Sequence, residues 1–196
     1  MFMIVFSIVL ALTDDGPFGL VAGSTPQQLI AAGVADLEEN PKTRGEFLTK
    51  KVPRPADGIE LYGVRISTRS GLCSVIAIGR NITSSSHGRE VMGRFAQVRE
   101  MLADSYGKPT EEINRLLPGS IWRQPQDWMM GLAKKERVLE SSWVARQDAP
   151  LRNRIRKIRV WATSRGMSVG AVTVWYEFDN YDDCEQEFKA KDRQAF

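Results

Sequence analysis

The fold is decided by the stretch IELYGVRIS-TRSG-LCSVIAIG, residues 59–79. Two runs rich in apolar and β-branched residues flank a four-residue turn that ends in glycine, which predicts a β-hairpin. In the first run two sets alternate: Ile59, Leu61, Gly63 and Arg65 on one face, and Tyr62, Val64 and Ile66 on the other. One face is therefore expected to be buried and the other partly exposed to solvent, as in an antiparallel sheet.

Further strand-like runs lie on both sides of this hairpin. Residues 46–52 precede it, and a second set of three follows later in the chain: 138–146, 153–163 and 169–178, with a turn at Ser164-Arg165-Gly166. The chain thus contains two sets of three strands.

Helical patterns precede each set of strands. Ser24 or Thr25 can cap a short helix that starts at Pro26 and ends at Gly33. In residues 88–106 the apolar positions recur at spacings of three and four, which predicts an amphipathic helix: Val91, Phe95, Val98, Leu102 and Tyr106. Shorter helices are expected at about 111–117, 126–136 and 182–192.

These elements predict an α+β domain spanning residues 1–196. We expect an antiparallel sheet covered on one face by helices, built from two similar helix-then-three-strand halves at about 16–82 and 86–178. An apolar segment, 1–12, and a C-terminal helix, 182–192, lie outside the repeat.

Composition narrows the class without naming a function. The 196 residues are 42% hydrophobic and 26% charged, which is typical of globular proteins rather than disordered or membrane proteins. A net charge of +3 is too small to indicate a nucleic-acid binder by itself.

The N-terminal run MFMIVFSIVLAL is too short to span a bilayer. It lacks the basic start of a secretory signal, although Val9-Leu10-Ala11 resembles a cleavage site. It suits either a truncated export signal or a buried strand, so both a cytoplasmic and an exported location stay open.

The two cysteines, Cys73 and Cys184, have no metal-binding or redox-motif spacing. They can pair only if the protein is exported. The favoured interpretation is two small buried hydrophobic residues.

Two short motifs resemble those of known helix-and-sheet modules. Gly23, Thr25, Gln28, Leu29 and Gly33 match a G-x-T-x-x-[EQ]-[LV]-x-x-x-G helix pattern, and a helix end of the form L…YG-x-P follows at Leu102, Tyr106, Gly107 and Pro109. In both, the chain resembles the BamE outer-membrane assembly lipoproteins and the tandem modules of β-lactamase inhibitory proteins. The chain departs from the lipoproteins in that no cysteine precedes Cys73. The resemblance implies a tandem helix-plus-sheet architecture.

No catalytic constellation, metal site or cofactor motif can be read in the chain. His87 is the only histidine, and the serines before it are better explained as helix caps than as nucleophiles. Gly107-Lys108-Pro109-Thr110 follows a helix rather than a strand, so it indicates a helix stop rather than a phosphate loop. Asp179-Asn180-Tyr181-Asp182-Asp183 lacks the glycine of a calcium loop and is typical of a helix start.

Charge patterning gives one candidate surface. Basic residues concentrate late in the chain, at Arg152, Arg154, Arg156 and Arg159. Acidic residues concentrate between Glu177 and Glu187, so cross-strand ion pairing is expected to cancel much of both fields. The functional alternative is a basic strand that binds an acidic protein surface or a phosphate backbone.

A second candidate surface is the loop-helix junction that carries Trp122, Trp128, Met129 and Met130. Tryptophan and methionine in such a place suit a protein-binding surface, but packing over the sheet explains them equally.

The predicted function is a non-enzymatic protein-binding module. Its specific form is an inhibitor or immunity-type protein that blocks a protein target through its sheet face or the Trp122–Met130 segment. The alternatives are an exported envelope assembly or scaffold protein, and a nucleic-acid-associated protein that uses residues 152–159. A protein partner is expected, with no membrane span and no cofactor.

Overall fold

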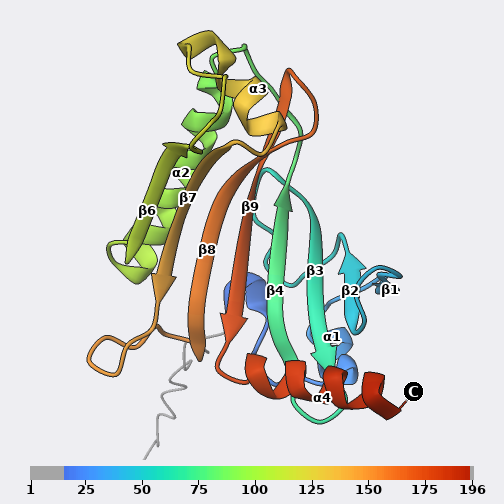
Figure 1. Ribbon diagram of the computed structural model, residues 1–196. Helices are drawn as coiled ribbons and strands as arrows, with labels where there is room; N and C mark the ends of the chain where they lie inside the picture. The colour runs from blue at the N-terminus through green and yellow to red at the C-terminus, as the bar shows by residue number, and fades with distance from the viewer. Residues whose placement is uncertain (1–15, 195–196) are drawn as a thin grey trace, which may run out of the picture.

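A computed structural model describes residues 16–194 (Figure 1), so the apolar segment 1–12 lies outside the described residues. All the strands belong to one antiparallel sheet with the order β1-β2-β3-β4-β9-β8-β7-β6, and β5 pairs with β9 beside this path. The strands are β1 (Glu38–Glu39), β2 (Glu46–Thr49), β3 (Ile59–Ser67), β4 (Gly71–Gly79), β5 (Ile82–Thr83), β6 (Glu111–Leu116), β7 (Arg137–Val144), β8 (Ile155–Ser164) and β9 (Val169–Phe178). The predicted α+β class and antiparallel sheet are confirmed.

The hairpin at residues 59–79 forms as its sequence predicts. β3 and β4 pair through Val64 and Val75, and Gly71 ends the turn between them. β4 then pairs with β9, so the meander β2-β3-β4 and the meander β7-β8-β9 meet at their last strands. The centre of the sheet is therefore built from segments about a hundred residues apart in the chain.

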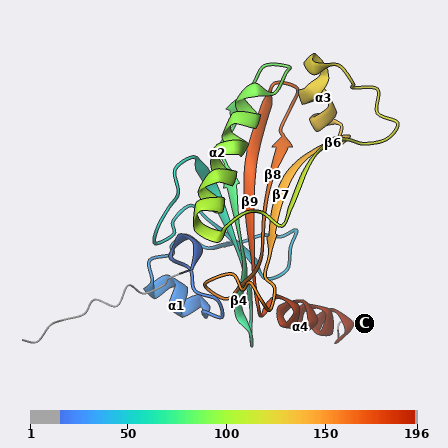
Figure 2. The ribbon, with the colours of Figure 1, turned by 90° about the vertical axis from the view of Figure 1, so that its left-hand side faces the viewer.

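Two helices pack on one face of the sheet, and a third crosses one end of the other face (Figure 2). The first face carries α1 (Pro26–Ala31) and α2 (Arg89–Tyr106), while α4 (Tyr181–Gln194) contacts β3 and β4 from the opposite side. Shorter helical segments are η1 (Pro17–Gly19), η2 (Pro125–Asp127) and α3 (Trp128–Ala133). Within residues 16–194, no helix is long and apolar enough to cross a membrane.

Local sequence explains the two helices of the covered face. In α1, Thr25 Oγ1 accepts a hydrogen bond from the Gln28 amide at 3.3 Å, and Gln28 Oε1 accepts one from the Thr25 amide at 2.8 Å. This reciprocal cap satisfies backbone donors at the start of a short helix. In α2 the apolar stripe is buried against the sheet, as its spacing predicts: Val91, Phe95, Val98 and Leu102.

The residues facing α2 form an apolar cross-strand row. It runs across six strands as Phe47, Val64, Val75, Tyr176, Ile158 and Trp143. Five of the six are buried, and Phe47 at the edge packs against them. Burial of this row supplies the main apolar core.

Two segments differ from the sequence prediction. The helix expected at 111–117 is the strand β6, which pairs along its whole length with β7 at the sheet edge. Ile113 and Leu116 are spaced as on a helix, but pairing with an available strand edge outweighs a weak helix preference. The helix expected over 126–136 is shorter, since α3 ends at Ala133 and Arg137 already belongs to β7.

Candidate functional site

The second face of the sheet, opposite α2, is the candidate site, and we call it the open face. Its residues alternate with those of the core and form cross-strand rows. One row contains Leu48, Gly63, Ile76, Trp175, Arg159 and Ser142. The next contains Leu61, Ile78, Thr173, Trp161 and Glu140. Figure 1 shows this face toward the viewer, with α4 across its lower end and no other described element over its middle.

A shallow hollow of about 290 Å³ lies near the middle of the open face. Gly63 and Ser74 form part of its lining, and the larger side chains Ile76, Trp161 and Trp175 also line it. A Cβ atom on Gly63 would lie 2.6 Å from Ile76 Cγ2 and 2.9 Å from Glu46 Oε1. The hollow therefore depends on a residue without a side chain at this point of β3.

Arginine side chains lie against aromatic rings along the open face. The Arg159 guanidinium lies 4.9 Å from the centre of the Trp161 ring, and that of Arg156 lies 5.0 Å from the Tyr181 ring. Tyr181 in turn meets Trp175 edge to face at 5.6 Å. These contacts restrict the orientation of large side chains that are only half-buried.

The same arginines are fixed by carboxylates. Arg159 donates two hydrogen bonds to Glu140, at 2.5 and 2.6 Å. Arg156 donates to Glu177 at 2.9 Å and to Asp182 at 2.5 Å. The Glu140 carboxylate raises the pKa of Arg159, so this side chain stays charged. The open face therefore presents aromatic rings and ion pairs in preset positions.

The structure separates the four arginines of the predicted basic strand. Arg156 and Arg159 lie on the open face, whereas Arg154 lies at the end of the sheet and pairs with Asp179 at 2.8 and 2.9 Å. Arg152 lies 5.0 Å over the ring of Tyr106, at the end of α2. The four arginines do not form one basic stripe. Arg154 and Arg156 pair with the acidic stretch at 177–187, as expected, whereas Arg159 pairs with Glu140 outside it.

The Trp122–Met130 segment is not one exposed patch. Core packing, the alternative to a binding surface, holds for Trp128 and Met129, which corrects their assignment as binding residues. Trp128 and Met129 are buried, and the Met129 amide donates to Ser86 O at 3.0 Å. Both belong to α3, which packs against β7 and β8. Trp122 and Met130 are half-buried beside a separate depression that also contains Met167.

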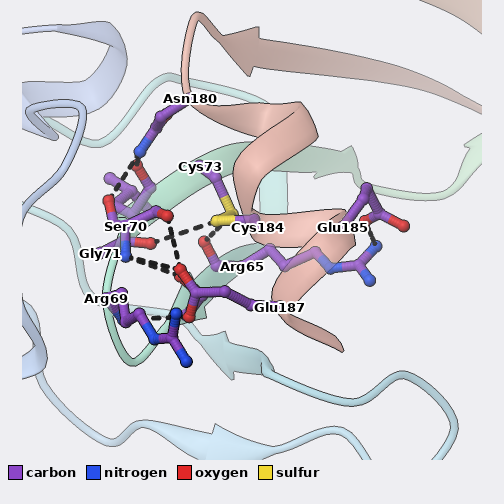
Figure 3. The surroundings of a disulfide bond; sticks show 11 residues. Arg65, Arg69, Ser70, Gly71, Cys73, Asn180, Cys184, Glu185 and Glu187 are labelled. Carbon is purple, nitrogen blue, oxygen red and sulfur yellow. Dashed lines mark hydrogen bonds and ion pairs between the residues drawn. A yellow bond between two sulfur atoms is a disulfide. The ribbon is translucent and has the colours of Figure 1, made fainter. Parts of the chain in front are cut away.

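The disulfide between Cys73 and Cys184 fastens α4 over one end of the open face (Figure 3). Their Cα atoms are 6.5 Å apart, and both residues are fully buried with Phe188 as their apolar neighbour. The favoured interpretation of two unpaired cysteines is therefore wrong. The pairing joins positions 111 residues apart, which spacing alone does not indicate.

Polar contacts hold α4 on both sides of this disulfide (Figure 3). Asn180 Nδ2 donates to Ser70 O at 2.7 Å and to Leu72 O at 3.1 Å. The Glu187 carboxylate accepts hydrogen bonds from the Ser70 amide at 3.0 Å and from Ser70 Oγ at 2.6 Å. The covered end of the face is therefore closed by specific bonds, and the hollow marks the uncovered part.

The residues considered for catalysis do not converge. His87 Nδ1 lies 3.5 Å from Ser86 Oγ, while the Glu90 carboxylate accepts hydrogen bonds from Ser84 and Ser85. Hydrogen bonds from its own amide and from these serines lower the pKa of Glu90 to about 2. Asp182 and Asp183 lie in the first turn of α4, as predicted for a helix start. Across the described residues, no group of three or more histidine, cysteine or acidic side chains is placed to hold a metal ion.

Sequence reasoning missed the central aromatic residues of the site, Trp161 and Trp175. Both lie within the strands predicted at 153–163 and 169–178, at positions that alternate with the core residues Val160 and Val174. The strand period of two, applied to both predicted strands, places the tryptophans on the face that also carries Arg159.

No protein-family model, curated protein or solved structure matches the chain, so the resemblance to BamE-like and β-lactamase-inhibitory-protein-like modules stays a prediction.

Proposed function

We propose that this protein is a non-enzymatic binding module that holds a target protein against the open face. The observation that carries the proposal is the uncovered hollow bordered by Trp161, Trp175 and Arg159. Tryptophan and arginine are the residues most often found at the energetic centres of protein interfaces. The specific form of this proposed role is that of an inhibitor or immunity-type protein, whose open face blocks a target.

Preset side chains favour binding because fewer of them must be ordered when a partner docks. Trp161 is stacked with Arg159, which Glu140 fixes on the neighbouring strand. The ion pairs leave the surface near charge balance, so its specificity would come from shape and from the pattern of charges. This neutralisation argues against the nucleic-acid alternative, which needs an uncompensated basic surface.

The test is affinity capture of partners from the source cells with wild-type protein and with Trp161→Ala/Trp175→Ala. A partner that depends on the open face should lose at least about 2 kcal/mol of binding free energy in this variant. Trp122→Ala is the matched control, since this tryptophan is also half-buried but lies outside the open face. Loss of the partner in the control alone would move the site to the Trp122–Met130 segment. Recovery of no partner, with turnover in an activity screen, would overturn the proposal.

We also propose that the protein acts in an oxidising compartment. Disulfides persist outside the reducing cytosol, and this one is buried where it fastens α4. This favours the exported alternative over the cytoplasmic one. Alkylation of thiols during lysis, followed by intact-mass measurement, should label neither cysteine; labelling of both in freshly lysed cells would contradict it.

A further inference from the structure

A second depression, separate from the open face, lies on the covered side along α2, and we call it the side cleft. It measures about 400 Å³, which is within the range of small-molecule sites. α2 forms one wall, residues 56–59 and Phe18 form the other, and β9 contributes Val174 and Tyr176. Figure 2 shows the loop that leads into β3 beside α2 on this side of the sheet.

The cleft is long and mainly apolar. Its lining runs along α2 from Arg94 to Tyr106, a helix rise of about 18 Å. Val98 and Leu102 line it between these ends. The opposite wall is held in place because the Phe18 ring meets Tyr62 at 4.9 Å and Tyr176 at 5.7 Å, both edge to face. A preformed apolar cleft of this length suits an extended hydrocarbon chain.

One end of the cleft carries a half-buried cation. Arg94 Nη2 donates to Asp57 O at 2.7 Å across the cleft. The guanidinium fits there because residue 58 is glycine: a Cβ at that position would lie 2.5 Å from Arg94 Nη2. The Asp57 carboxylate accepts a hydrogen bond from the Gly58 amide at 2.9 Å. Arg94 is thus positioned by a carbonyl oxygen rather than by an acid.

The arginines of the open face have a different kind of partner from Arg94. Arg65, Arg156 and Arg159 each form an ion pair with a carboxylate. Within residues 16–194, no carboxylate lies within ion-pair distance of Arg94. A half-buried guanidinium whose positive charge is not matched has capacity for an anionic ligand.

We propose that the side cleft binds a small amphiphile that has a hydrocarbon chain and a carboxylate head. The chain lies along Val98, Leu102 and Val174, and the carboxylate pairs with Arg94. This site does not depend on the open face or on its partner.

The test uses decanoate as the probe, with calorimetric titration of the whole protein. Saturable binding of one decanoate is expected, and decylammonium, with the same chain and the opposite charge, should bind at least about tenfold more weakly. Arg94→Gln should weaken decanoate binding about tenfold, because it removes one charge-assisted contact. Ser105→Trp, which places a ring at the lining of the cleft from an exposed position, should abolish binding.

Two matched controls are available. Arg99→Gln removes a charge from the same helix where Arg99 pairs with Glu112 at 3.0 Å, and it should leave decanoate binding unchanged. Arg152→Gln removes the cation at the far end of α2, over Tyr106, and should also have little effect. Each variant is first shown to unfold at the wild-type denaturant midpoint. The proposal is overturned by absence of saturable binding, by equal affinity for both head groups, by undiminished binding in Ser105→Trp, or by a larger loss in Arg152→Gln than in Arg94→Gln.

Discussion

The two faces of the sheet are built from the same strands and have opposite characters. On the covered face the row from Phe47 to Trp143 is apolar throughout. One residue along each strand, the neighbouring row on the open face mixes Gly63, Trp175 and Arg159. Because side chains alternate along a strand, one sequence can supply a core on one side and a recognition surface on the other. The comparison predicts that substitutions on the two faces act on different properties.

Removal of a tryptophan from each face should show this difference most strongly. Trp143 is 1% exposed, and its indole N–H donates to Gly107 O at 2.7 Å. Trp143→Ala is therefore expected to lower the free energy of unfolding by about 3–5 kcal/mol. Trp175→Ala should cost less than about 2 kcal/mol, because its half-buried ring leaves a smaller void. Guanidinium denaturation of both variants measures the difference, and equal losses would show that the open face is a second core.

Removal of the disulfide tests whether this bond holds α4 over the end of the open face. Cys73→Ala/Cys184→Ala should lower the free energy of unfolding by about 2–4 kcal/mol, because the unfolded chain is no longer cross-linked. Faster amide hydrogen exchange is expected in α4, with the strands β8 and β9 less affected. Wild-type protein treated with a reducing agent should match the variant, whereas an unchanged denaturant midpoint in both would rule out a stabilising disulfide.

Much of the fold could be predicted from the sequence because its signals are local. Period-two runs located β3, β4, β8 and β9, and the stripe from Val91 to Leu102 located α2. β6 could not be predicted, since six residues at a sheet edge become a strand only through their partner β7. The cysteine pairing was missed for a similar reason, as it depends on α4 crossing the open face.

The candidate site could be predicted only in part. Charge predicts Arg156 and Arg159, but it predicts Arg152 and Arg154 equally, because charge alone does not indicate the side to which each residue points. Trp128 and Met129 were selected by residue type, and the structure buries both. Whether an aromatic residue lies in a core or on a surface depends on what packs over it, and that is set by distant segments of the chain.

The ion pair between Arg159 and Glu140 provides the smallest test of the two-face comparison. Its side chains are 38% and 15% exposed, so solvent screens much of the attraction. A double-mutant cycle with Arg159→Gln and Glu140→Gln should therefore give a coupling energy of about 1 kcal/mol or less in the free energy of unfolding. The same cycle, measured on binding of a captured partner, should give a larger coupling, because docking excludes water from the pair and from the Trp161 ring beneath Arg159. A pair that contributed several kcal/mol to folding and nothing to binding would assign Arg159 to the scaffold, and the open face would then lose the charged part of its recognition surface.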